Sequence, residues 1–191
     1  IDERFKIPPP DLGVHVTEPL EPLVSAVDQT GRVVTDVVAY RDRRYLGGFE
    51  KTAYQGVAKP HYVEVELPEE RPGTGPIVLI GTGWTRPTDS SINLALSQGS
   101  HTRAGGVAVE VADGSGGWRT VSENIGFPAG KAKTMVIDLT ELTDGDVPDR
   151  IRLRTRAEIY WDRIAWTREL PDVEPRVRRA NLDSAVLRYR G

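Results

Sequence analysis

The sequence predicts one all-β domain, an antiparallel two-sheet β-sandwich of jelly-roll-like form with little helix. Three observations predict this fold: apolar and polar residues alternate in several short runs, glycine- and proline-rich turns separate the runs at a spacing of roughly ten residues, and no long amphipathic helix is present. The chain has 191 residues, which is enough for one such domain with a sizeable core.

Four of the predicted strands have one apolar face. The residues expected to face inward are Val63, Val65 and Leu67 in 61–67; Val107, Val109 and Val111 in 106–111; Met135, Ile137 and Leu139 in 134–139; and Ile151 and Leu153 in 150–155. Residues 76–80 are apolar without a break, apart from the leading proline, which predicts a central strand buried on both faces. Turn residues fill 71–75, 113–117, 128–130 and 143–146.

Three segments are predicted along the chain. Residues 1–22 form a proline-rich lead-in, because Pro8-Pro9-Pro10 and the later prolines favour extended, solvated backbone. Residues 23–168 form the sandwich. Residues 169–191 form a linker and a C-terminal tail, with one more strand expected within 184–190.

Composition excludes several classes of site and partner. The chain has no cysteine, so disulfides, thiolate catalysis and cysteine-ligated metals are excluded. A net charge of −3 and a pI near 5.7 predict no nucleic-acid partner. No apolar run reaches the roughly 20 residues of a membrane-spanning helix, so no membrane span is expected. The chain shows neither a signal peptide nor an initiator methionine, so we expect a processed chain or a fragment of a longer one.

A family resemblance rests on three stretches. They are 80–84 continuing through 87–93 to 97–98, then 126–131 followed by 133–139, and finally 151–155 followed by 158–162. In this order they resemble the β module that accompanies FG-GAP, ASPIC/UnbV and tetratricopeptide-repeat regions of large bacterial proteins. The resemblance implies neighbouring domains of a larger exported chain as partners and an extracellular or periplasmic location. The resemblance brings no particular catalytic activity with it.

A second resemblance is to galactose-binding-like jelly rolls, the fold of many carbohydrate-binding modules. These often finish on a strand that reads aromatic, hydrophobic, Asp, polar, hydrophobic, and Tyr160-Trp-Asp-Arg-Ile164 reads in that way. The likeness implies a glycan as a partner and a structural calcium ion as the one expected cofactor.

Asp162 is the candidate metal ligand. Strict alternation over 159–166 places Asp162 on one face with Tyr160, Ile164 and Trp166. A carboxylate on an apolar face must be paired or ligating, because an unpaired buried charge is costly. Three roles follow: a structural hydrogen bond or arginine pair, a calcium ligand, or a direct ligand contact. If the opposite face is the core, Asp162 is instead exposed.

The candidate ligand-binding residues are Trp84, Asp89, Asn93 and Trp118. Both tryptophans lie near turn-rich segments, where an aromatic ring can serve as a sugar platform or can close one end of the sandwich. In 85–93, Asp89 and Asn93 can chelate a hydroxylated ligand or a hard cation, or Asp89 can cap a turn by accepting backbone N–H bonds.

The arginines Arg150, Arg152, Arg154 and Arg156 share one face of a predicted strand. They form either an anion-binding stripe or a solvated face neutralised by a neighbouring strand. Glu64 and Glu66 have the right pattern for that neighbour, and exposed pairs of this kind contribute about 0.2–1 kcal/mol each.

No catalytic signature is present. The three histidines are scattered, and no P-loop, Rossmann fingerprint or GxSxG motif occurs. We therefore expect a non-catalytic accessory or interaction domain of a larger exported bacterial protein. A carbohydrate-binding module with a structural calcium site is the alternative, and a hydrolase of unrecognised type is a second alternative.

Overall fold

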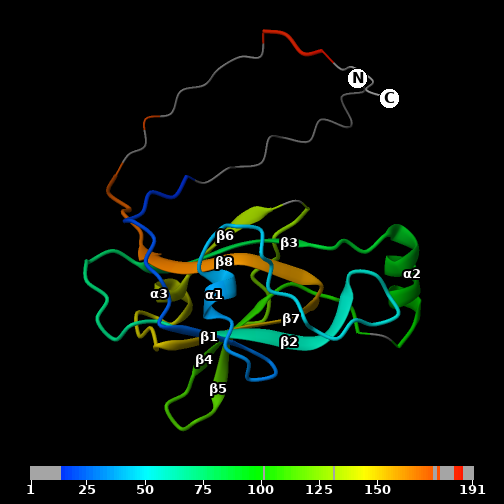
Figure 1. The fold of residues 1–191 in the computed structure, drawn as a ribbon, viewed down its shortest axis with the longest axis horizontal. Coiled ribbons are helices and arrows are strands. Elements are labelled where there is room, and N and C mark those ends of the chain that lie inside the picture. The colour runs from blue at the N-terminus through cyan, green and yellow to red at the C-terminus, as the bar shows by residue number, and fades with distance from the viewer. Residues whose placement is uncertain (1–13, 101, 131, 174–175, 177–182, 187–191) are drawn as a thin grey trace.

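The computed structural model describes residues 14–100, 102–130, 132–173, 176 and 183–186. Two antiparallel sheets form the predicted β-sandwich (Figure 1). The strand orders are β1-β2-β7-β4-β5 and β6-β3-β8. The elements are β1 (Ser25–Asp28), α1 (Thr35–Val38), β2 (Val57–Glu66), β3 (Ile77–Thr85), α2 (Ser90–Gln98), β4 (Ala108–Ala112), β5 (Trp118–Ser122), β6 (Lys133–Asp138), α3 (Leu139–Leu142), β7 (Arg150–Ala157) and β8 (Ile159–Arg168).

The five-stranded sheet has the predicted inward faces. Leu153 of β7 lies between Val63 of β2 and Val109 of β4 in the ladder, and the next inward row is built on Ile151 in the same way. These side chains are almost fully buried in one core that both sheets share. The predicted run 134–139 differs at its end, because Leu139 is buried as expected but begins α3 instead of ending a strand.

The three-stranded sheet is centred on β3. Residues 78–80 are buried on both faces, as their continuous apolar sequence predicts. Gly81 lies against the Trp161 ring of β8, and a Cβ at Gly81 would come within 2.8 Å of that ring. A glycine is required here because the indole occupies the space of a side chain.

A β-bulge in β8 contradicts the strict alternation predicted for 159–166. The ladder with β3 shifts register here, and Asp162 is the extra residue. The bulge changes the phase of the strand, so Trp161 before it and Ile164 and Trp166 after it all face the core. The prediction that Trp161 lies on the face opposite Ile164 and Trp166 is therefore wrong.

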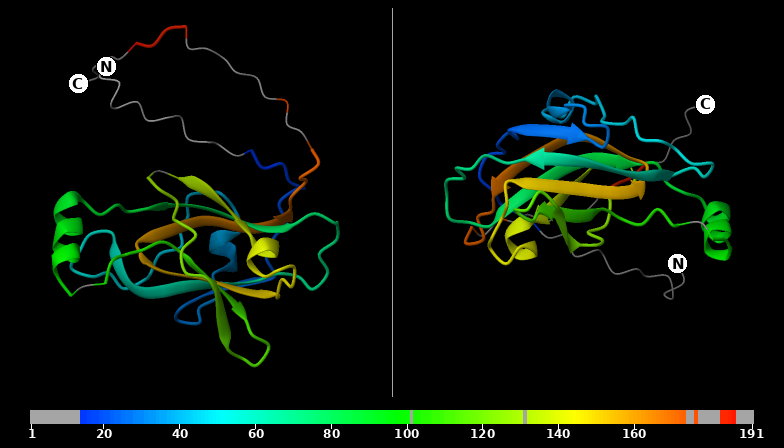
Figure 2. Two further views of the ribbon diagram at one scale, coloured as in Figure 1. Left: turned by 180° about the vertical axis from the view of Figure 1, so that it is seen from behind. Right: turned by 90° about the horizontal axis from the view of Figure 1, so that it is seen from below.

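The ends of the described domain lie apart from α2. Thr17 and Glu21 form bridges with Glu169 and Trp166, so the incoming segment runs beside β8 and the outgoing chain. Both arms leave the sandwich at the end opposite α2 (Figures 1 and 2). Of the tail strand predicted within 184–190, residues 184–186 form no strand and the others lie outside the described residues.

Within the described part of the chain, no helix is long and apolar enough to cross a membrane.

Candidate functional site

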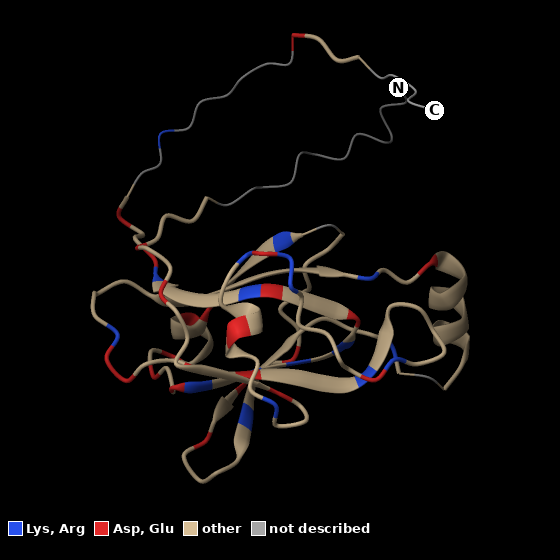
Figure 3. Cartoon of the chain, viewed as in Figure 1, with Lys and Arg blue, Asp and Glu red and all other residues tan. Residues whose placement is uncertain are grey.

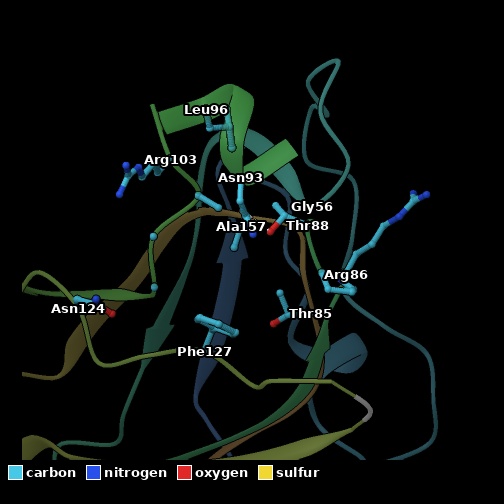
Figure 4. A pocket seen from close by; sticks show the side chains of 14 residues that line it. Gly56, Thr85, Arg86, Thr88, Asn93, Leu96, Arg103, Asn124, Phe127 and Ala157 are labelled. Atoms are coloured by element: carbon cyan, nitrogen blue, oxygen red, sulfur yellow. Dashed lines mark hydrogen bonds between the residues drawn. The ribbon is translucent and has the colours of Figure 1, made fainter. Parts of the chain in front are cut away.

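A cavity of about 500 Å³ opens at the α2 end of the sandwich (Figure 4). Separate segments of the chain converge on it: the turn before β2, the end of β3, α2, the segments that flank the β4–β5 hairpin, and the end of β7. Each of these segments contributes lining residues. Examples, in chain order, are Gly56, Thr85, Asn93, Arg103, Phe127 and Ala157.

Local capping builds the α2 wall of the cavity. The Asp89 carboxylate accepts the Ile92 N–H over 2.8 Å and caps the N-terminus of α2. Asp89 therefore has the capping role, one of the two roles predicted for it. The Thr88 hydroxyl donates to the Asn93 side chain over 2.8 Å, which fixes the amide at the cavity wall. The nine-residue helix itself was not predicted from the sequence.

A glycine brings the turn before β2 close to the β3–α2 loop. Gly56 has φ +80°, and a Cβ there would come within 2.8 Å of the Arg86 carbonyl oxygen and the Thr88 nitrogen. Its N–H donates to the Glu158 carboxylate over 2.9 Å, and Glu158 is only 2% exposed. This turn therefore has no room for a side chain, and a buried carboxylate anchors it.

The cavity contains an unpartnered buried hydroxyl. Thr85 is 7% exposed, and its Oγ1 finds no hydrogen-bond partner among the described residues. Figure 4 shows this hydroxyl directed toward the side of the cavity where Phe127 lies, a residue that is 48% exposed. A buried hydroxyl without a partner is unfavourable by about 1–3 kcal/mol. The cavity thus combines an unused polar group with an exposed aromatic residue.

The interior of the cavity is neutral. Arg86 and Arg103 belong to the lining, but Figure 4 shows their guanidinium groups directed away from the interior. The Arg86 guanidinium instead lies 3.3 Å from the Gln55 side-chain oxygen and 3.9 Å from the Glu158 carboxylate. No charged residue occurs along α2 either (Figure 3).

Comparison of the chain with known protein families, curated protein sequences and solved structures finds no match. The resemblances to the exported β module and to galactose-binding-like jelly rolls therefore stay predictions. The function has to be inferred from the geometry of the site itself.

Trp84 borders a second hollow beside the cavity. Tyr160 stacks on one face of the Trp84 indole, with ring centroids 4.4 Å apart and planes 10° apart, and Tyr45 meets it edge-on at 6.1 Å. The hollow is lined by Tyr45, Trp84 and Pro87, together with Gly130 on the loop before β6. Trp84 is therefore both packed against its neighbours and open to a surface depression.

Trp118 lies elsewhere, on the outer face of the five-stranded sheet. The Arg152 guanidinium lies 3.9 Å from the Trp118 ring centroid and 3.9 Å from that of Tyr62. The Arg150 guanidinium is a second neighbour of this ring, 5.3 Å from the Trp118 centroid. The structure thus separates Trp118 from Trp84, Asp89 and Asn93, and it packs the Trp118 ring against arginines.

The arginine row is neutralised by glutamates from both neighbouring strands. Glu64 pairs with Arg150 and Arg152, and Glu110 pairs with Arg152 and Arg154. The neutralised face was predicted with Glu64 and Glu66, but Glu66 accepts a hydrogen bond from Ser25 and Glu110 takes its place. The pairs are also less exposed than predicted, because the side chains of Glu64, Glu110 and Arg152 are 12%, 11% and 18% exposed.

Asp162 is buried, with 1% exposure, at the β8 bulge. Its carboxylate accepts the Arg43 backbone N–H over 2.7 Å, which connects β8 to the loop after α1. Of the roles predicted for Asp162, the geometry matches the structural hydrogen bond. Within the described residues, no cluster of three or more His, Cys, Asp or Glu side chains could hold a metal ion.

The cavity offers binding groups but few catalytic ones. Its described lining contains two amides, two threonine hydroxyls, the two arginines that point away from the interior and apolar side chains, and it contains no carboxylate or imidazole. Acid–base hydrolysis generally needs a positioned carboxylate or histidine. The groups that are present can donate and accept hydrogen bonds and can stack on an apolar ligand face.

Sequence reasoning missed Thr85, Phe127 and Glu158. Phe127 could have been found, because it lies in the turn-rich stretch 126–130 and the same signal selected Trp84 and Trp118. Thr85 and Glu158 carry no such signal, because their importance depends on which segments the fold brings against them.

Proposed function

We propose that this chain is a non-catalytic accessory domain that binds a hydroxylated, carbohydrate-like ligand in the cavity at the α2 end. The observation that supports this most is the Thr85 hydroxyl, which is buried, unpartnered among the described residues and directed toward the side of the cavity where the exposed Phe127 lies.

Such a ligand complements the groups that line the cavity. The Thr85 oxygen is itself covered, so a rotation of this side chain would present it to a ligand hydroxyl, which would supply the hydrogen bond that the described part of the protein does not. The Asn93 amide on the α2 wall offers a second polar contact, and the Phe127 ring can stack on the apolar C–H face of a sugar. The volume of about 500 Å³ lies within the usual range for small-ligand sites.

The accessory role is supported by where the site lies. The arms that lead into and out of the sandwich are at the end opposite α2, so neighbouring domains attached through them would leave the cavity open. We place such a domain in a larger exported bacterial protein, in line with the family resemblance. A structural calcium ion is not part of this proposal.

The test is binding to a panel of neutral saccharides by isothermal titration calorimetry. Thr85→Val removes the hydroxyl at nearly constant volume, so we expect a folded protein of at least parental stability and roughly tenfold weaker binding. Thr82→Val is the matched control, because Thr82 is buried on the same strand and its hydroxyl is already paired with Thr134. Binding to no saccharide, or equal binding by Thr85→Val and the parent, would contradict the proposal.

A further inference from the structure

The cavity and the hollow beside Trp84 are adjacent. Thr85 and Pro87 line both of them, so the end of β3 and the loop after it form the shared wall. The hollow has a volume of about 600 Å³ and is bordered by fewer segments than the cavity. The cavity is thus enclosed by several segments that converge on it, whereas the hollow is an open depression along the rim.

Trp84 is held in a fixed orientation at this hollow. Tyr160 stacks on it, and the Tyr160 hydroxyl donates to the buried Glu158 carboxylate over 3.1 Å. Phe49 supports Tyr160 in turn, with ring centroids 5.2 Å apart. A ring held by this series of contacts loses little freedom when a ligand stacks on it, so more of the contact energy appears as affinity.

We propose that the ligand is a linear, neutral oligosaccharide that occupies two subsites. Its terminal unit enters the cavity between Thr85 and Phe127, and the next unit crosses the shared wall at Pro87 and stacks on the part of the Trp84 indole that borders the hollow. This inference rests on the proposed function, and it adds the length and the charge of the ligand.

The shapes of the cavity and the hollow indicate which sugar unit each of them binds. A cavity surrounded on several sides accepts the end of a chain, whereas an open depression with an aromatic floor accepts a unit from which the chain continues. The outward direction of the two rim arginines, together with a neutral α2, argues for an uncharged ligand. An acidic sugar in the cavity would find no cation directed at it among the described residues.

The experiment is calorimetry with β-1,4-linked glucose, mannose, galactose and xylose series of one to four units. For the series that binds, the parent should gain roughly tenfold in affinity between one unit and two or three units. Trp84→Ala should abolish this gain while leaving the affinity for the single unit within about twofold. Phe127→Ala should weaken binding at every length. Trp118→Ala is the matched control and should bind as the parent does.

Folding and the alternative outcomes are controlled separately. Thermal melting verifies that Trp84→Ala is folded. If Trp84→Ala does not fold, Tyr45→Ala is the second variant, because it leaves the Trp84–Tyr160 stack in place. Tyr45→Ala should reduce the gain in affinity with ligand length. Affinity that is independent of length, or an equal loss in Trp84→Ala at all lengths, would overturn the two subsites and leave the cavity proposal standing. Tighter, salt-sensitive binding of glucuronate-terminated chains would overturn the neutral ligand. Binding of no series would overturn both proposals.

Discussion

Replacing Asp162 by alanine tests how the β8 bulge holds the loop after α1. The carboxylate is buried and accepts the Arg43 N–H over 2.7 Å, and the described residues offer it no ion pair. A hydrogen bond to a charged group is worth about 1.5–3 kcal/mol. Part of this is offset because a buried carboxylate is itself poorly solvated. We expect Asp162→Ala to lower the free energy of unfolding by about 2 kcal/mol.

Urea and thermal unfolding measure this change. In a chain of this size, 2 kcal/mol corresponds to a fall in Tm of about 4–8 °C. Asp162→Asn is the matched control, because it keeps an oxygen acceptor and should lose roughly half as much. A variant as stable as the parent would refute the role assigned to this hydrogen bond.

A chelator separates this role from the calcium site that the sequence also predicted. If the Arg43 N–H is the partner of Asp162, then EDTA should leave the parental Tm unchanged. If EDTA reproduces the instability of Asp162→Ala in the parent, then Asp162 is a calcium ligand and its carboxylate does not act through the Arg43 hydrogen bond alone.

Three further changes have expected outcomes. Arg152→Ser should lower the free energy of unfolding in urea by about 1–3 kcal/mol, because it removes two ring contacts and two largely buried ion pairs. Arg156→Ser, on the same strand and without an ion pair among the described residues, should cost little, and equal losses in the two variants would contradict this. Burial lowers the pKa of His61 from its usual 6.5, with a weaker opposing effect from its bond to the Lys59 carbonyl. The unfolded chain therefore takes up the proton first, so stability present above about pH 6.5 should be lost as the pH falls toward 5; a His61→Gln variant with the same pH profile would show that another group is responsible. Gly56→Ala should weaken saccharide binding and lower Tm, because its Cβ meets the β3–α2 loop; unchanged binding would mean that this wall is not part of the site.

The core could be predicted from the sequence because its signal is local. Alternation in 61–67, 106–111 and 150–155 depends only on the period of a strand, and the inward rows follow it. The β8 bulge could not be predicted in this way. A single extra residue reverses the alternation beyond it, and its cause is the pairing with β3, which is distant in sequence.

The candidate site was predicted in part. Trp84, Asp89 and Asn93 lie at the α2 end of the sandwich, whereas Trp118 is on another face. The short polar side chains of 85–93 are typical of a turn, but the Asp89 cap starts a nine-residue helix there. Residue type alone could not show that the Thr85 hydroxyl lacks a partner among the described residues, because that depends on the packing of several separate segments.

Chemical-shift mapping of the ¹⁵N-labelled protein with the tightest-binding neutral trisaccharide tests the central claim most directly. We predict that the largest shifts fall on the amides of Thr85, Asn93 and Phe127 and on the Trp84 indole N–H, with Trp118 unaffected. Shifts centred on Trp118 and the arginine face, or an unchanged spectrum at saturating saccharide, would contradict binding in the cavity.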